Sequence, residues 1–435
     1  MPVNENVGTP AAVGYGGLMD AAAQAFDRLL PCPLPARIGL AVSGGSDSTA
    51  LLHLATEWAA RSGVALHVVT VDHGLRPEAA DEARAVATQA AALGLSHDTL
   101  HWTGWDGTGN LMDHARRARY ALMADWAKAR DINHIALGHT ADDVAETFLM
   151  RLAREAGVDG LSAMSPRSHR DGVEFIRPIL ALKRGDLRDF LLARGRTWAD
   201  DPSNTDPGYE RVRARQVLAA LAPLGITTDG LAHVAANLRD VRRALDWYTF
   251  LAARDAASVD RGDVLICLRK LRNLPDEIAR RLLVHALCWV SGAEYAPRRR
   301  AVQTLLDGLF EGRGMALHGC RVVILTGADR GRLRICRDPR AVADTRAAPG
   351  SPWDGRWQLE GQWPDGVELR ATGPDGLAQL EDWRAAELPE PAAQSAPAVW
   401  RGQTLIASPL LGLNAGSIAK LLKQDEEFFN SLLVS

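Results

Sequence analysis

The stretch that decides the fold is RIGLAVSGGSDS, residues 37–48. A short apolar run from Ile38 to Val42 stops at a small-residue turn, and an apolar helical pattern begins at Ala50. Strand, glycine turn and helix N-terminus together form an anion site, because glycine lets backbone N–H groups approach a phosphate and the helix dipole favours negative charge. The predicted phosphate-binding loop consists of Ser43, Gly44, Gly45, Ser46, Asp47 and Ser48.

The sequence of this turn excludes two common types of phosphate-binding loop. The chain contains no Gly-Lys pair, so it has no GxxxxGK[ST] loop, and the turn lacks the GxGxxG spacing of dinucleotide-binding folds. An ordinary Ser/Gly turn that caps a helix is the remaining alternative.

Length and composition indicate a globular protein with more than one domain. A chain of 435 residues is long enough for two or three domains, each with its own core. No apolar run approaches the roughly 20 residues that span a bilayer. The first 18 residues contain no Lys or Arg, which argues against a signal peptide and favours a disordered leader. The five cysteines never form a CxxC pair, which argues against a zinc or cluster site and predicts a cytoplasmic location.

The net charge of −3 hides an asymmetry along the chain. Residues 231–300 carry 13 Lys and Arg against 8 Asp and Glu, whereas residues 341–435 carry 7 against 13. A polyanion is therefore expected to dock on the middle of the chain, although a solvated helical surface gives the same counts.

From residue 37 to about 155, apolar strand candidates alternate with helical patterns. This alternation predicts an α/β fold, a doubly wound parallel sheet with helices on both faces and ligands at the carboxyl ends of the strands. The predicted strands and helices are, in turn, residues 37–43, 65–72, 96–102 and 133–138, and residues 48–61, 77–93, 110–130 and 140–154.

The rest of the chain is expected to form a mainly helical domain and then a small β-rich one. One helix is predicted at 183–195, apolar residues recur at helical spacing over 209–311, and residues 315–338 have the pattern of a β-hairpin. Five tryptophans are expected to pack the last domain: Trp353, Trp357, Trp363, Trp383 and Trp400.

The loop after the second predicted strand carries two candidate phosphate ligands. His73 can bond a phosphate or a ribose hydroxyl, and Arg76 can contact the phosphates of a nucleotide or a substrate. A turn residue followed by a helix-flanking arginine is the alternative.

The fourth predicted strand leads into a helix with an acidic face. His139, Asp142, Asp143 and Glu146 fall at i, i+3, i+4 and i+7, which is one side of a helix. Three carboxylates on one face repel each other unless they hold a cation, either Mg²⁺ or the ammonium group of an amino acid. The alternative is a capping box between Thr140 and Asp143, which does not account for Glu146 or His139.

Two further segments are candidates for RNA contact. The predicted helix 110–130 carries Arg116, Arg119 and Tyr120, of which Arg116 shares a face with each of the others. Farther on, aromatic side chains can stack on an unpaired base and alternating arginines can contact phosphates; these residues are Trp198, Tyr209, Arg211, Arg213 and Arg215. Solvated surface is the alternative for both segments.

Together these segments resemble the tRNA(Ile)-lysidine synthases, a family of pyrophosphate-loop (PP-loop) ATP pyrophosphatases. The resemblance covers about residues 37–220. The matching pieces are SGGSDS (43–48), VDHGLRPE (71–78), ARRARY (115–120), GHTADDVAET (138–147), RLAREAGVDGLSAM (151–164), RPIL (177–180) and WADDPSNTD (198–206). The chain departs from the family pattern at Glu155 and Ala156, where a glycine-rich loop is usual, and at Val144, where Gln is usual.

The resemblance implies a ligase that joins L-lysine to C2 of the wobble cytidine in the CAU anticodon of tRNA(Ile). ATP first adenylates the cytidine with release of pyrophosphate, and lysine then displaces AMP.

The expected catalytic residues are Asp47, His139, Asp143 and Glu146. The loop residues 43–48, His73 and Arg76 are expected to bind ATP, Asp143 and Glu146 to bind lysine, and Asp47 and Asp142 to bind Mg²⁺. The expected tRNA-binding residues are Arg116, Arg119, Tyr120, Trp198, Arg211, Arg213 and Arg215.

The implied organisation is a leader at 1–18, a PP-loop catalytic domain at 19–220, a helical tRNA-binding domain at 221–312 and an α+β tRNA-recognition region at 313–435. The alternatives are another PP-loop enzyme that acts on tRNA, such as a thiolase, and an inactive tRNA-binding homologue. The scattered cysteines argue against the first, and the intact SGGSDS and GHTADDVAET segments argue against the second.

Overall fold

The computed structural model describes residues 15–74, 78–105, 108, 111–199, 206 and 208–433. Contacts divide the chain into two compact units, Met1–Arg242 and Arg243–Ser435. Residues 1–14 of the expected leader lie outside the described residues. Its last four residues are not a leader, because helix α1 begins at Tyr15 and Leu18 is buried.

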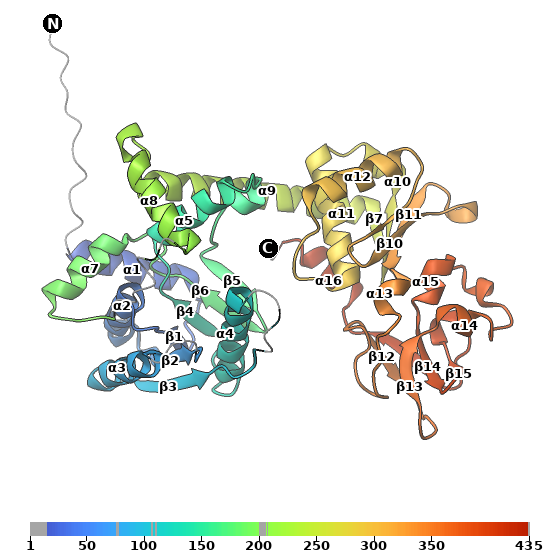
Figure 1. Cartoon of the computed structure of the whole chain (residues 1–435), viewed down its shortest axis with the longest axis horizontal. Helices are drawn as coiled ribbons and strands as arrows, with labels where there is room; N and C mark the ends of the chain where they lie inside the picture. The colour runs from blue at the N-terminus through green and yellow to red at the C-terminus, as the bar shows by residue number, and fades with distance from the viewer. Residues whose placement is uncertain are drawn as a thin grey trace, which may run out of the picture. The chain divides into compact units, whose positions relative to one another are not determined.

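A six-stranded sheet forms the centre of the first unit, in the order β3-β2-β1-β4-β6-β5 (Figure 1). All neighbouring strands are parallel except β5, which runs antiparallel to β6 at one edge. The strands are β1 (Arg37–Ala41), β2 (Ala65–Asp72), β3 (Ser96–His101), β4 (His134–Leu137), β5 (Arg167–Arg170) and β6 (Val173–Ile176). The doubly wound parallel sheet and the four predicted strands are confirmed.

Helices cover both faces of this sheet, as the alternating pattern predicted. The first unit contains α1 (Tyr15–Leu29), α2 (Ser46–Ser62), α3 (Ala79–Ala92), α4 (Leu111–Lys128), α5 (Ala141–Leu152), α6 (Val158–Leu161), α7 (Arg184–Ala193), α8 (Glu210–Leu221), a short 3-10 helix (Ala222–Leu224) and the start of α9 (Thr228–Ala256). Each helix predicted between residues 48 and 154 is present, with bounds that differ by one or two residues.

Strand β1 shows why the sheet has two buried faces. Side chains alternate along a strand, so Ile38 and Leu40 face a core formed largely by α1, α2 and α7. Ala41 faces the other core, formed with α4. Gly39 also faces α4, where a Cβ atom would lie only 2.9 Å from the Trp126 ring. Two buried faces explain the continuous apolar run of this strand.

The order of the strands places the expected site at a point where the topology reverses. From β1 the chain winds outward through β2 and β3, and then returns to place β4 on the other side of β1. Loops that follow β1 and β4 therefore leave the sheet in opposite directions and open a crevice between them, the usual ligand position in doubly wound sheets. The phosphate loop follows β1, and the acidic helix α5 follows β4.

The second unit is built on an antiparallel five-stranded sheet, in the order β7-β8-β11-β10-β9. The predicted hairpin at 315–338 is confirmed, because β10 pairs with β11. The prediction that residues 209–311 are all helical is wrong at 257–267, where β-propensity and pairing with β11 produce two strands. The elements are β7 (Ala257–Asp260), β8 (Asp263–Cys267), α10 (Leu268–Arg272), α11 (Asp276–Ser291), α12 (Arg299–Phe310), β9 (Ala316–Leu317), β10 (Cys320–Ile324) and β11 (Arg332–Arg337).

Two small antiparallel sheets complete the second unit. One pairs β12 with β16, and the other has the order β13-β14-β15. The predicted tryptophan packing is present: Trp353, Trp357 and Trp400 are buried, and Trp363 and Trp383 are partly buried. The elements are α13 (Pro339–Val342), β12 (Trp357–Glu360), β13 (Glu368–Ala371), α14 (Gly373–Leu377), α15 (Glu390–Gln394), β14 (Pro397–Arg401), β15 (Thr404–Ala407), β16 (Ile418–Leu421) and α16 (Asp425–Asn430).

No single helix among the described residues has both the length and the apolar composition of a membrane span. Within the described part of the chain, one pair of segments, 210–224 and 228–256, meets that test when taken together, and the two are bent by 100° relative to each other.

Candidate active site

Hydrogen bonds between residues of the phosphate loop fix its conformation. Gly44 has a φ of +89°, a backbone conformation that favours glycine. The Ser48 hydroxyl donates to the Gly45 carbonyl at 3.0 Å and accepts from the Ser43 backbone N–H at 3.1 Å. The loop is thereby fixed at the N-terminus of α2, where an anion is favoured.

The two loops of the crevice approach each other closely at Gly138. A Cβ atom at this position would lie 2.9 Å from the Cα of Ser48 and 3.0 Å from its backbone nitrogen. Since both are backbone atoms, neither can move without shifting the start of α2. Glycine is therefore required here by packing.

We expect Gly138→Ala to lower the free energy of unfolding by about 1–3 kcal/mol, the usual cost of overpacking, and to weaken ATP binding by displacing the phosphate loop. Denaturant unfolding and ATP titration measure the two effects. Gly185→Ala is the matched control, because a Cβ atom at Gly185 meets nothing within 4 Å. Equal stability of the two variants would contradict this account of Gly138.

Helix α5 begins with the capping box that the sequence offered as an alternative. The Thr140 backbone N–H and its hydroxyl both donate to Asp143 Oδ2, at 2.9 and 3.0 Å. The cap uses only this oxygen, and Asp143 Oδ1 faces arginines across the cavity. Asp143 therefore caps the helix and also contributes to the site.

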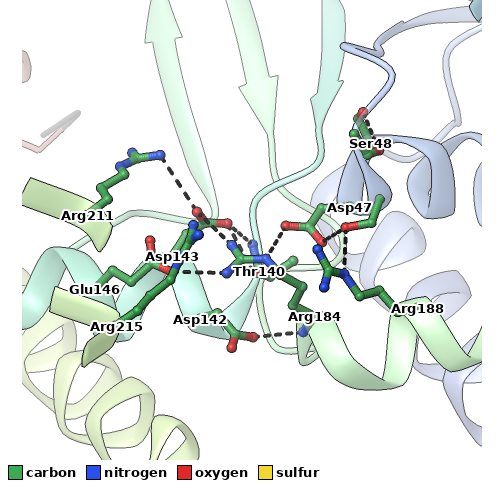
Figure 2. A network of polar contacts seen from close by, with 12 residues as sticks. Asp47, Ser48, Thr140, Asp142, Asp143, Glu146, Arg184, Arg188, Arg211 and Arg215 are labelled. Atoms are coloured by element: carbon green, nitrogen blue, oxygen red, sulfur yellow. Dashed lines mark hydrogen bonds and ion pairs between the residues drawn. The ribbon is translucent and has the colours of Figure 1, made fainter. Parts of the chain in front are cut away.

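A single arginine bridges the phosphate loop and the acidic helix. Figure 2 shows Arg184, the first residue of α7, reaching between Asp47 and the carboxylates of α5. Its Nε donates to Asp47 Oδ2 at 2.9 Å, and its Nη1 donates to Glu146 Oε1 at 3.0 Å. Its Nη2 lies 3.4 Å from Asp143 Oδ1. The three acids expected in one site are thus brought together.

Helix α8 supplies two further arginines to the same carboxylates (Figure 2). Arg215 Nε donates to Glu146 Oε1 at 2.6 Å, and Arg211 Nη1 lies 3.8 Å from Asp143 Oδ1. The side chain of Glu146 is only 1% exposed, and its Oε2 has no hydrogen-bond partner among the described residues. A buried carboxylate oxygen without a donor is costly, which makes it a ready acceptor for a ligand.

Burial and charge act in opposite directions on the acids of the site. Burial raises the pKa of Asp47 above its ordinary value, although Arg184 opposes the rise. Burial also acts to raise the pKa of Asp143, but the charge of Arg184 and the hydrogen bond from Thr140 hold it below its ordinary value. Asp143 is therefore ionised at neutral pH.

His139 is held as a neutral donor. Burial and the nearby charge of Arg177 lower its pKa to about 3. Arg177 Nε donates to His139 Nδ1 at 3.2 Å, so the ring proton of the neutral imidazole lies on Nε2. In this state His139 can donate a hydrogen bond to a phosphate oxygen and is poorly suited to act as a base.

Two cavities adjoin at the carboxyl edge of the sheet. The first has a volume of about 330 Å³ and is lined by the phosphate loop, His139, Asp143 and five arginines: Arg119, Arg184, Arg188, Arg211 and Arg215. The second, of about 470 Å³, has mainly apolar walls from β1, β2 and α4 and includes His73, Met112 and Tyr209. Ser43, Glu82 and Arg119 line both cavities, so the two are neighbours.

The chemistry of the site fits Mg²⁺ only in part. Mg²⁺ is usually held by one or two carboxylates together with substrate phosphates. Asp47 lines the first cavity and fits that role. Asp142 does not, because its Oδ2 accepts a hydrogen bond from the Arg184 backbone at 2.7 Å at the start of α7 and the residue does not line the cavity. Among the described residues, no group of three His, Cys, Asp or Glu side chains is placed to hold a metal ion.

The structure separates the residues that were expected to contact RNA. Tyr120 is only 5% exposed and packs edge-on against Phe175 in the core, so the expectation that it contacts RNA is wrong. Trp198 packs partly buried against the first core, with Arg188 over its ring. Arg116 and Arg213 are exposed, whereas Arg119, Arg211 and Arg215 line the first cavity. Arg76 and the segment 200–205 lie outside the described residues.

Three arginines of the site were not predicted as functional residues: Arg177, Arg184 and Arg188. Arg188 Nε lies 3.3 Å from Ser46 Oγ, on the phosphate loop. Only Arg177 had a sequence signal, because it lies in the RPIL segment that matches the family.

The departure from the family pattern at Glu155 has a structural counterpart. Glu155 has a φ of +55°, in the left-handed region that glycine adopts easily and other residues rarely adopt. The chain therefore keeps the backbone conformation expected of a glycine while carrying a larger side chain.

Comparison with known proteins agrees with this geometry. Residues 19–221 match a family model described as a PP-loop domain. A tRNA(Ile)-lysidine synthase of Ruegeria pomeroyi is 54% identical over 399 residues, which is 92% of this chain and 94% of the relative. The chain belongs to the tRNA(Ile)-lysidine synthase family.

A second relative of the tRNA(Ile)-lysidine synthase family shows lower identity. The enzyme of Rhodopseudomonas palustris is 43% identical over 62% of this chain and 80% of its own length. Among solved structures, a U34-tRNA thiolase from Methanococcus maripaludis has a TM-score of 0.44 and 16% identity, over 55% of this chain and 89% of that chain. As a family member with a PP-loop domain, the chain is an ATP-using ligase of tRNA modification.

Proposed function

We propose that this protein ligates L-lysine to C2 of the wobble cytidine in the CAU anticodon of tRNA(Ile), with cleavage of ATP to AMP and pyrophosphate. Family membership supports the proposal. The observation that carries it is the placement of the phosphate loop and the buried carboxylate of Asp143 around one cavity, with Glu146 linked to Asp47 through Arg184 behind it. The side with the phosphate loop suits a nucleotide, and the side with the carboxylates suits an amine.

The first step activates the cytosine ring. Its C2 carbonyl is a poor electrophile, so O2 attacks the α-phosphorus of ATP, the bond to the β-phosphate breaks, and pyrophosphate leaves. The loop serines and the backbone N–H groups at the start of α2 would hold the pyrophosphate. His139 would donate from Nε2 to a phosphate oxygen, and Arg188 would add positive charge beside Ser46. Mg²⁺, held by Asp47 and the phosphates, would neutralise the developing charge.

The second cavity is the proposed site for the nucleoside of ATP. It continues from the phosphate loop over the carboxyl ends of β1 and β2, and its walls include Val69, Val71 and Met123. Apolar walls suit a flat base, and His73, which also lines this cavity, would bond a ribose hydroxyl.

The second step transfers the amine. The lysine ε-amine attacks C2, the bond from C2 to the adenylated oxygen breaks, and AMP leaves. Asp143 and Glu146 would bind an ammonium group of lysine, with the unpartnered Glu146 Oε2 as one acceptor. Before the attack, the ε-ammonium loses a proton to a base other than His139, because Nε2 of that ring already carries a proton and Nδ1 accepts a hydrogen bond from Arg177.

Arg213 is the α8 arginine best placed to contact RNA, because it is exposed and does not line the first cavity. We expect Arg213→Ala to weaken tRNA binding and to flatten its salt dependence by roughly 0.7–0.9 in the log–log slope if one phosphate contact is lost. Binding of ATP and lysine should stay unchanged.

The control for this prediction is Arg61→Ala, at the opposite end of α2 from the phosphate loop. Filter binding of CAU-anticodon tRNA at several salt concentrations measures both variants. An unchanged salt slope for Arg213→Ala would show that this face of α8 contacts solvent and not tRNA.

The proposed function is tested by exchange of labelled pyrophosphate into ATP. We expect exchange only when tRNA is present, because cytidine is the group that is adenylated. Exchange without tRNA would indicate an enzyme that activates a small molecule, and no exchange under any condition would indicate an inactive tRNA-binding homologue. Incorporation of sulfur instead of lysine would indicate a thiolase.

A further inference from the structure

We propose that Arg184 is the resident cation of the amine site and must leave Asp143 and Glu146 before lysine can bind there. This inference rests on the proposed function. It assigns to Arg184 the role of a positioning residue that couples the occupancy of the phosphate loop to that of the amine site.

The geometry of Arg184 shows that it holds the place of a substrate cation. Each of its three guanidinium nitrogens faces a different carboxylate: Asp47 at 2.9 Å, Glu146 at 3.0 Å and Asp143 at 3.4 Å. Its side chain is 16% exposed and lines the first cavity, so its charge is shielded from water. Removal of such a cation leaves buried acids facing one another, which is strongly unfavourable.

The backbone of Arg184 is fixed separately from its side chain. The backbone N–H of Arg184 donates to Asp142 Oδ2 at 2.7 Å, which anchors the start of α7. The side chain can therefore change rotamer while the helix stays in place. This contact also gives Asp142 a function that requires no metal.

The surrounding charges resist a second cation while Arg184 is in place. Among the described residues, Arg184, Arg211 and Arg215 face the same three acids, so three guanidinium groups already oppose three carboxylates. A lysine ammonium added to this set would be an excess positive charge in a poorly solvated site. Lysine is therefore expected to bind weakly to the enzyme without nucleotide.

Polyphosphate supplies the charge that allows Arg184 to move. The Nε of Arg184 already contacts Asp47 on the phosphate loop, and its neighbour Arg188 contacts Ser46 on the same loop. The negative phosphates of ATP at this loop would attract the guanidinium of Arg184 toward them and away from α5. Lysine can then take its place on Glu146 and Asp143. Because coupling free energy is reciprocal, lysine should also strengthen nucleotide binding.

The test is a calorimetric titration of L-lysine into the full chain, with and without an ATP analogue whose α–β bridging oxygen is a methylene group. For the unchanged protein we expect lysine affinity to rise at least 10-fold when the analogue is present. In Arg184→Gln, lysine should bind at least 10-fold more tightly without nucleotide, and the analogue should have little further effect. A role of Arg184 that is merely structural would instead weaken lysine binding in both conditions.

Two further variants keep the proposal falsifiable. Arg184→Lys retains the charge but cannot face three carboxylates at once, so its nucleotide-free lysine affinity should lie between those of the unchanged protein and Arg184→Gln. If Arg184→Gln does not fold, the nucleotide-free lysine affinity of Arg184→Lys provides the test instead. Arg194→Gln, near the other end of α7 and paired with Glu57 at 3.3 Å, is the matched control and should bind lysine as the unchanged protein does.

The outcomes separate this inference from the proposed function. If the unchanged protein forms lysidine but neither Arg184 variant binds lysine more tightly without nucleotide, the inference is overturned and the function stands. Equal lysine affinity of the unchanged protein with and without the analogue would also overturn it. If the unchanged protein binds no lysine under any condition and forms no lysidine, the proposed function itself fails.

Discussion

Asp47→Ala is expected to abolish formation of AMP and pyrophosphate while tRNA binding stays near its normal level. Asp47 stands in the first turn of α2, lines the first cavity and contacts Arg184, so its loss removes the proposed cation ligand on the phosphates. The loss of one group that stabilises transition-state charge typically costs about 10²–10³-fold in rate. Single-turnover release of AMP measures the effect.

The control for Asp47 is Asp189→Asn, an exposed carboxylate on α7. It should leave AMP release unchanged. Near-normal turnover of Asp47→Ala would contradict the assignment of residues 43–48 as the nucleotide site, because no other acid of the loop is available to replace Asp47.

Glu146→Gln is expected to raise the KM for lysine by roughly 30- to 150-fold, while adenylation of the tRNA persists. One charge-assisted hydrogen bond in a buried site is worth about 2–3 kcal/mol, which gives this range. Steady-state kinetics with varied lysine, together with tRNA-dependent ATP–pyrophosphate exchange, separate the two steps.

Glu210→Gln provides the matched control for Glu146. Glu210 lies on α8 and pairs with Arg154 at the surface, so its replacement should leave the lysine KM unchanged. Loss of pyrophosphate exchange in Glu146→Gln would show that Glu146 acts in adenylation. An unchanged lysine KM would assign Glu146 to the packing of α5 against α8.

The first unit was predictable from sequence because its signals are local. The apolar run from Ile38 to Val42 and the glycine turn after it predict β1, the phosphate loop and the start of α2 without reference to any distant residue. The acidic face of α5 follows equally from the helical period. Both observations depend only on residues within a few positions of each other.

Arg184 was not predictable in this way. It stands in a polar segment at the start of a short helix, and its partners Asp47 and Glu146 lie 137 and 38 residues away. No periodicity indicates such a contact, because it arises when the loops after β1 and β4 and the helix α7 meet at one edge of the sheet.

The arginines of α8 show the same limit. Their spacing at 211, 213 and 215 predicted one basic surface, but a helix places alternate residues on different sides. Arg215 turns toward Glu146, whereas Arg213 is exposed. Tyr120 had a helical position compatible with exposure, and only the packing against Phe175 places it in the core.

The most direct test of the central claim is incubation of the protein with ATP, labelled L-lysine and a CAU-anticodon tRNA(Ile), followed by nucleoside analysis. The account predicts that the label appears in a lysine-substituted cytidine at the wobble position, that one AMP forms per lysine, and that omission of ATP prevents the reaction. Labelled tRNA without change at that cytidine, or formation of AMP without transfer of lysine, would contradict it.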